Sequence, residues 1–391
     1  MILKILPRAR VHVGVPLSRD IYDVNGKLLL SKRSIIRTEL QLEKLLAHGA
    51  YVDANSLEDG PENTLFSQAL KSAAPVGLLQ EWQQIVGVLQ TLFSGPEKKY
   101  DFPSQVEKVA AHIVSLHDIN ADFSIYRILR QEGYLASRYG YTHAVHTAVL
   151  CILLSRHFRW SAQRMMSLVK AALTMNMTIA KLQGTMAGQS GPVEKSQHAE
   201  IIGHPGKTVT LLKALGVTDP DWLAAVEQHH ERADGKGYPA GCKEVCEIAS
   251  VLRLADIFTA KVSPRTFRAA LSVQEGIAAV FLDDQGGAMS TALIKTLGIY
   301  PPGDLVRMVS GELGIVVERT SNARGPIVAS ITDAAGRPVP RLLRRDTRQA
   351  EFSIAGHAID KSILQRLLPE RLYGFAIINS LDLPPLEFLI E

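Results

Sequence analysis

A switch in hydrophobic periodicity is the feature that most constrains the fold of this chain. From about residue 66 to residue 290, apolar residues recur at helical spacing, as in "LLQEWQQIVGVLQTLF", "VEKVAAHIVSLH" and "HAVHTAVLCILLSRHF". After "GIYPPGD" the pattern changes to short alternating segments, "LVRMVS", "LGIVVERT" and "PIVASITD", separated by Gly, Asn and Pro. We therefore predict a mainly α fold, in which a helical bundle is followed by a small β-rich module.

The first 53 residues predict a small α/β module. "RVHVGV" alternates, Asn25-Gly26 is a hairpin turn between "DIYDV" and "KLLL", and Thr38 with Gln41 forms a capping-box pattern before "ELQLEKLLAHG". The polar stretch "DANSLEDGPENT" is typical of a linker. The predicted divisions are 1–53 for the α/β module, 54–134 for a linker and helical segment, 135–298 for the helical domain and 299–391 for the β-rich module.

Composition excludes several classes of protein. None of the apolar runs reaches the roughly 18 to 20 uncharged residues that a membrane span needs, and "MILKILPRARVHVGV" is broken by charges before a signal peptide could form. The three cysteines are too few for a disulfide framework, which favours a cytoplasmic protein with reduced thiols. The net charge of +4 gives little reason to expect nucleic acid, and the arginines of "RLLRRDTRQ" are interpreted as a solvated face.

The stretch "EQHHERADGKGYPAG", residues 227 to 241, carries the most explicit chemistry. It follows a helix that Asp219 can cap and that Pro220 can begin. Neighbouring helical residues point about 100° apart, so His229 and His230 should not easily chelate one ion from the same side. They could instead serve two metals, or one metal and a ligand.

The glycines after the histidine pair predict a tight turn. Gly235 and Gly237 permit a positive φ, and Pro239 stiffens the exit, which would present Tyr238 at a fixed place. Imidazoles and a carboxylate that converge from separate helices build iron, manganese or zinc centres in bundles. Further residues of the ligand type are His143 in "YTHAVHTA", His204 in "GHPGK" and Asp256 in "LADIFTAK", whereas His146 and His157 are interpreted as core residues.

The segment "HHERADGKGYPAG" closely resembles the signature of the HD-GYP family, a branch of the HD metal-dependent phosphohydrolases whose members hydrolyse cyclic di-GMP. The resemblance covers roughly residues 135 to 275. "SPRTFRAAL" is similar to the family's "DRPYRKAL", where basic residues face the nucleotide phosphates. The resemblance implies metal ligands at His143, His204, His229, His230 and Asp256, and ligand-binding residues at Asp234, Gly237, Tyr238, Pro239, Arg265 and Arg268.

The chain departs from the family where the family carries "LLHDIGK". The equivalent segment is "LTMNMTI", with Met175 at the histidine and Asn176 at the aspartate that bridges two metals. A thioether and a neutral amide cannot replace that pair for hard divalent ions. We therefore expect at most one divalent transition-metal ion (iron, manganese or zinc), held by His204, His229 and His230, with His143 and Asp256 left with too few partners. Ile179 stands at the family lysine, and Lys181 follows two residues later.

Three hypotheses follow from the resemblance and its departure. The favoured one is a divergent HD-GYP protein of bacterial cyclic di-GMP signalling, with little or no phosphodiesterase activity, which binds cyclic di-GMP or a related nucleotide, other signalling proteins, or both. The second is an active phosphodiesterase with a one-metal mechanism. The third is a purely structural interaction domain. Metal content separates the first two from the third, and turnover separates the first from the second.

Overall fold

The computed structural model describes residues 3–5, 17, 20–23, 26, 28–30, 36, 42, 45, 50–53, 75–95, 101–130, 135–266, 269–284, 286–358, 372–373 and 377–379. The chain forms two compact units. Unit 1 comprises Met1–Glu81 and Arg366–Leu383, and unit 2 comprises Trp82–Gln365 and Pro384–Glu391.

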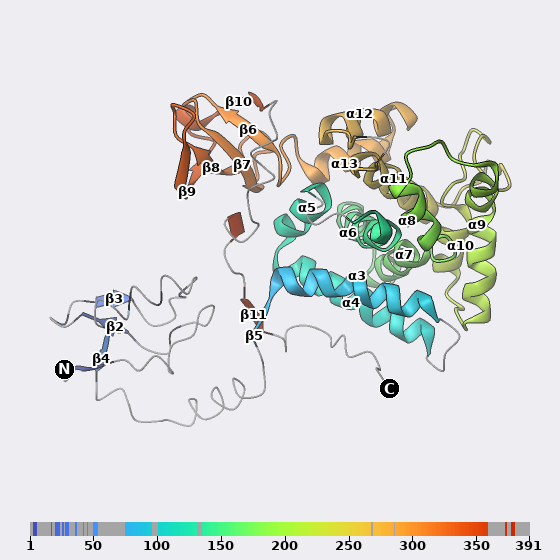
Figure 1. Ribbon diagram of the computed structural model, residues 1–391, viewed down its shortest axis with the longest axis horizontal. Helices are drawn as coiled ribbons and strands as arrows, with labels where there is room; N and C mark the ends of the chain where they lie inside the picture. Colours follow the sequence, from blue (N-terminus) through green and yellow to red (C-terminus); the bar gives the residue numbers. More distant parts are fainter. Residues whose placement is uncertain are drawn as a thin grey trace. The chain divides into compact units, whose positions relative to one another are not determined.

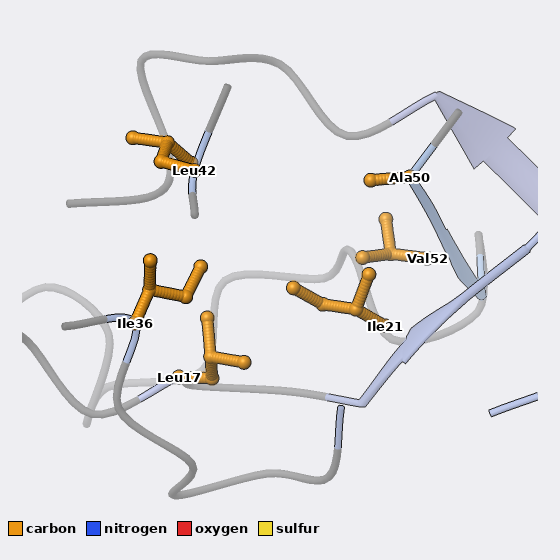
Figure 2. Close-up of a cluster of buried hydrophobic side chains, with 6 residues drawn as sticks. All are labelled: Leu17, Ile21, Ile36, Leu42, Ala50 and Val52. Carbon is orange, nitrogen blue, oxygen red and sulfur yellow. The ribbon is translucent and has the colours of Figure 1, made fainter. Parts of the chain in front are cut away.

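Unit 1 contains a four-stranded antiparallel sheet in the order β1 (Leu3–Ile5), β4 (Tyr51–Asp53), β2 (Ile21–Tyr22) and β3 (Leu28–Leu30). The predicted hairpin is confirmed: β2 pairs with β3, and Gly26 between them takes a positive φ of 77°. Leu17, Ile21, Ile36, Leu42, Ala50 and Val52 are buried together and form the core of this unit (Figure 2). The predicted "RVHVGV" strand, the Thr38–Gln41 cap and the linker after residue 53 lie outside the described residues.

A second sheet in unit 1 pairs β5 (Pro75–Gly77) with β11 (Ile377–Asn379) in antiparallel register. This strand interrupts the region that periodicity predicts as helical. Three residues are too short to show an alternating pattern, and their hydrogen-bonding partner lies at the other end of the chain. Local sequence therefore carries no sign of the pairing.

Helices make up most of unit 2, and α6 lies in the middle of them (Figure 1). Every residue of α6 from Tyr139 to Ser155 except Thr142 is buried, because α7, α8 and α11 all pack on it. The close approach of α8 requires a glycine, since a Cβ at Gly140 would lie 2.4 Å from the carbonyl oxygen of Ala180. The helices are α3 (Leu78–Ser94, which crosses from unit 1), α4 (Phe102–Ile119), α5 (Ala121–Arg130), η3 (Ala136–Arg138), α6 (Tyr139–His157), α7 (Ala162–Thr174), α8 (Ala180–Gly188), α9 (Lys195–Ala214), α10 (Pro220–Gln228), α11 (Glu247–Val262), α12 (Val273–Asp283), α13 (Ala288–Leu297) and η4 (Ala350–Phe352).

The predicted β-rich segment forms a five-stranded antiparallel sheet in unit 2, in the order β10-β6-β7-β8-β9. Its strands are β6 (Leu305–Met308), β7 (Leu313–Glu318), β8 (Ile327–Thr332), β9 (Pro338–Asp346) and β10 (Ile354–His357). The predicted fold class, mainly α with small sheets towards both ends, is confirmed. No helix among the described residues is both long and apolar enough to cross a membrane. The exact domain divisions stay a prediction.

Candidate metal centre

Three histidines meet where α10 ends. Asp219 accepts a hydrogen bond from the backbone N–H of Trp222 and so caps the start of α10, as expected. The helix stops at Gln228, and His229 is its C-cap, so the chain leaves the helical path before His230. The rings of these two histidines consequently lie only 4.0 Å apart, although neighbours within a continuous helix would diverge. The expectation that they face different sides is wrong for this reason.

His204 on α9 completes the cluster. The ligand nitrogens of His204, His229 and His230 all lie within 4.8 Å of one another. His204 and His229 are fully buried, and the side chain of His230 is 17% exposed. The structure thus brings together the three residues from which the sequence predicts a metal site.

Hydrogen bonds fix the protonation of two of these rings. The Nδ1 atom of His204 lies 2.6 Å from the carbonyl oxygen of Ile201, and that of His229 lies 2.7 Å from the carbonyl oxygen of Val226. Because a carbonyl oxygen only accepts, each Nδ1 carries the hydrogen. The two Nε2 atoms, 3.1 Å apart, then face each other with lone pairs.

Protonation of one Nε2 atom would turn this contact into a hydrogen bond, but burial disfavours the charged form of both rings. Burial lowers the pKa of His204 to about 3, helped by the neighbouring His229, and burial also lowers the pKa of His229. A metal cation between the nitrogens would resolve the contact, since metal–imidazole bonds of about 2.0–2.1 Å suit nitrogens at this separation. Metal-binding histidines also commonly donate the other ring N–H to a carbonyl. The residues therefore fit a transition-metal ion.

His143 and Asp256 form a pair beside this cluster. The Nε2 atom of His143 lies 2.7 Å from Oδ1 of Asp256, and both residues are buried. Burial acts to raise the pKa of Asp256, but the hydrogen bond from His143 and the nearby imidazoles outweigh it and hold the pKa well below its usual range. Each of the two residues is thus the hydrogen-bond partner of the other, and the expectation that they have too few co-ligands to hold a second metal ion stays a prediction. Oδ2 of Asp256 also lies 4.0 Å from Nδ1 of His230.

The substituted pair lies in the turn between α7 and α8. Met175 is the C-cap of α7, and Met175 and Asn176 are 0% and 4% exposed. Oδ1 of Asn176 has no hydrogen-bond partner in the described part of the chain. The turn is bonded to α9 through the hydroxyls of Thr178 and Thr208, 2.8 Å apart. Thr208 is one helical turn beyond His204, so the substituted turn lies close to the histidine cluster. Lys181 is exposed.

The segment from Glu231 to Cys242, here called the glycine loop, is organised by a carboxylate that sequence reasoning missed. Glu231 is 2% exposed and accepts hydrogen bonds from the backbone N–H groups of Ala240, Gly241 and Cys242 at 2.7, 3.2 and 3.1 Å. These bonds close the loop onto the end of α10. The only sign of this role in the sequence is that Glu231 directly follows the histidine pair.

Gly235 and Gly237 of the glycine loop serve different purposes. Gly235 has the expected positive φ, 75°, but Gly237 does not. Gly237 is needed instead for close approach, since a Cβ there would lie 2.5 Å from the backbone nitrogen of Arg232. Tyr238 donates its backbone N–H to the carbonyl of His230 at 3.2 Å, and its ring stacks on the His230 ring at 4.4 Å. The Tyr238–Pro239 bond is cis.

The carboxylate of Asp234 is hydrogen-bonded to other residues of the glycine loop. It binds Nε and Nη2 of Arg232 at 3.0 and 2.9 Å and accepts the backbone N–H of Lys236, and these bonds from Arg232 and Lys236 lower its pKa. Arg232 also binds Asp283 of α12, which in turn binds Arg253 of α11. Asp283 lies 51 residues after Arg232, so nothing in the sequence motif indicates this link.

Arg265 is half-buried. Its Nη2 donates to the hydroxyl of Tyr139 at 3.0 Å, and the Tyr139 ring stacks on His143 at 5.5 Å. Tyr139 was not among the predicted residues. Arg265 is therefore connected to the His143–Asp256 pair through one aromatic ring, while Arg268 lies outside the described residues.

The chain is similar in sequence to several known proteins. Residues 132–284 match the model of the HD domain family. This match, together with the relatives below, supports a divergent HD-GYP protein. The chain is 25% identical over 221 residues to the cyclic di-GMP phosphodiesterase PA4108 of Pseudomonas aeruginosa, covering 55% of this chain and 51% of that protein. It is 27% identical over 145 residues to the 3′3′-cGAMP-specific phosphodiesterase 3 of Vibrio cholerae, covering 36% of this chain and 31% of that protein.

The chain thus spans about half or less of the length of these two relatives. A solved structure of an HD-GYP-type protein from Bdellovibrio bacteriovorus, Bd1817, is similar to the chain with a TM-score of 0.47 and 15% identity, and the match covers 74% of this chain and 97% of that one.

Proposed function

We propose that this divergent HD-GYP protein binds cyclic di-GMP or a related nucleotide beside a single metal ion, and that it hydrolyses the nucleotide weakly or not at all. The observation that carries the proposal is the substituted turn. Met175 and Asn176 are buried next to a histidine cluster that is otherwise retained. A bridging carboxylate is what holds two metals around one water in this chemistry, and Asn176 offers only a neutral amide.

In this proposal His204, His229 and His230 hold the ion through ring nitrogens. The ion would supply Lewis-acid polarisation of a phosphate oxygen. Arg265 would donate charge-assisted hydrogen bonds to phosphate, and the Tyr238 ring and hydroxyl would lie against the nucleotide. A cytoplasmic location in bacterial signalling, and contacts with other signalling proteins, belong to the same proposal.

Metal content is the first test. Elemental analysis of the purified protein should find at most one transition-metal ion per chain, and His229→Ala with His230→Ala should lose it, because two of three nitrogen ligands are gone. His157→Ala, at the end of α6, is the matched control and should keep the ion; the interpretation of His157 as a core residue is wrong, because its side chain is exposed. Two tightly held ions per chain, or full occupancy in the double variant, would contradict the proposal.

Turnover is the second test. With manganese or iron supplied, hydrolysis of cyclic di-GMP should be absent or very slow, although calorimetry detects binding. Met175→His with Asn176→Asp restores an imidazole and a carboxylate to the turn and should raise the number of bound ions. Met175→Leu with Asn176→Gln changes the same two positions without adding an imidazole or a charge. This second double variant controls for the perturbation of the turn and should leave metal content unchanged.

A one-metal phosphodiesterase is the second candidate, and the facing Nε2 atoms of His204 and His229 favour it over a purely structural domain. Robust hydrolysis by the unmodified protein that is abolished by His230→Ala would establish this enzyme. Absence of both metal and nucleotide binding in the folded protein would leave the interaction domain as the surviving hypothesis.

A further inference from the structure

A second candidate site lies beside the glycine loop. A cavity of about 270 Å³ is lined by one face of α11, the carboxyl end of α12, Met289 of α13 and the first residues of the loop. The α11 residues are Ser250, Arg253, Leu254 and Ile257, which follow the spacing of one helical face. The lining does not include His204, His229 or His230, the ligands of the proposed metal centre.

Two polar groups on the walls keep unused hydrogen-bonding capacity. Nη2 of Arg253 donates to Asp283 at 2.7 Å, but within the described part of the chain Nε and Nη1 have no partner, and the side chain is 19% exposed. Oδ2 of Asp284 accepts the backbone N–H of Ser290 at 2.9 Å, while its Oδ1 has no partner among the same residues. The cavity therefore offers a flat guanidinium donor and a carboxylate acceptor.

Part of the lining is apolar, where Leu254, Ile257, Val280 and Met289 contribute side chains. A flat ring can contact such walls with its faces while its edges meet the polar groups. The volume lies just below the roughly 300 Å³ at which pockets for drug-sized ligands begin. It therefore suits a single heterocyclic base and not a dinucleotide.

We propose that this cavity binds a guanine base. Guanine carries the acceptors O6 and N7 side by side, which match one edge of a guanidinium bidentately. In Arg253 that edge consists of the second hydrogen of Nη2 together with Nε–H or Nη1–H. The N1–H and amino group of guanine can donate to a carboxylate. Adenine places an amino donor beside N7 and would oppose it to Arg253. The lining holds Arg232 and Arg253 against four carboxylates, those of Glu231, Asp234, Asp283 and Asp284. This excess of negative charge disfavours phosphate, so the nucleoside should bind better than its monophosphate.

Calorimetry of the full chain with guanosine, in EDTA to keep metal from the histidine site, tests the proposal. Guanosine should bind saturably, and adenosine and guanosine 5′-monophosphate should each bind at least about tenfold more weakly. Arg253→Lys keeps the charge but loses the planar fork, and should weaken binding by about tenfold or more. The matched control is Arg345→Lys, which alters a bidentate pair with Glu312 in the β-sheet and should leave guanosine binding unchanged.

A second variant tests the proposal independently in case Arg253→Lys misfolds. Ser250→Phe fills the cavity without touching an ion pair and should abolish binding in a protein that melts as the wild type does. His229→Ala with His230→Ala should bind guanosine normally, which separates this site from the proposed metal centre. The proposal is overturned if guanosine does not bind, if adenosine binds equally, or if binding survives both cavity changes and depends on the histidines.

Discussion

At the scale of single residues, His146 gives the chain a pH-dependent stability. It is buried on α6, and burial, with the charges of Arg127 and His143, lowers its pKa from 6.5 to about 3. In the unfolded chain His146 takes up a proton below about pH 6.5, whereas in the folded chain it does so only at about pH 3. The free energy of unfolding should therefore decrease as the pH is lowered through this window, by up to about 1.4 kcal/mol per pH unit for this one group.

His146→Gln removes this titration. In urea unfolding, the difference in unfolding free energy between variant and wild type should shift in favour of the variant by up to about 2 kcal/mol between about pH 7 and pH 5. Leu153→Ala, a buried and uncharged change on the same helix, is the control and should cost the same at both pH values. An equal pH dependence in the wild type and in His146→Gln would contradict the argument.

At the scale of elements, Glu231 makes the glycine loop a rigid extension of α10. Glu231→Ala would leave three backbone N–H groups without their acceptor and should lower the free energy of unfolding by about 3 kcal/mol. Hydrogen exchange at Ala240, Gly241 and Cys242 should accelerate together, because one carboxylate holds all three amides. Glu231→Gln keeps an acceptor oxygen and should lose less stability.

The control for this change is Glu227→Ala, an exposed residue one turn earlier on α10, which should alter stability by no more than about 0.5 kcal/mol. Unchanged exchange in the loop of Glu231→Ala would show that the loop is held by other contacts.

At the scale of the whole molecule, sequence patterns correctly predicted the features that depend only on residues close together in the chain. The hairpin at Gly26, the cap at Asp219 and the strands after residue 300 each depend on a few neighbouring residues, and the structure confirms them. The sequence could not predict contacts between distant segments, such as the pairing of β5 with β11. In the site, the ligand types were evident, but their convergence depends on where α10 ends and on how α9 packs against it, which no single segment encodes.

The junction between helices and sheet in unit 2 depends on one such distant contact. Arg319, directly after β7, donates its backbone N–H and Nε to Asp122 of α5 at 3.2 and 2.5 Å, and its Nη1 to the carbonyl of Thr296 on α13 at 2.7 Å. The carboxylate of Asp122 is only 17% exposed, so removing the arginine would leave it poorly solvated.

Arg319→Ala should therefore lower the free energy of unfolding by about 2 kcal/mol, less than for a fully buried pair because Arg319 is partly exposed. The amides of β7 should exchange faster, since the strand loses its tie to α5 and α13. Arg337→Ala breaks an ion pair with Asp333 within one turn, where the arginine side chain is 79% exposed, and should cost no more than about 0.5 kcal/mol. Equal losses in the two variants, measured by urea unfolding, would mean that the Arg319 contacts do not hold the sheet against the helices.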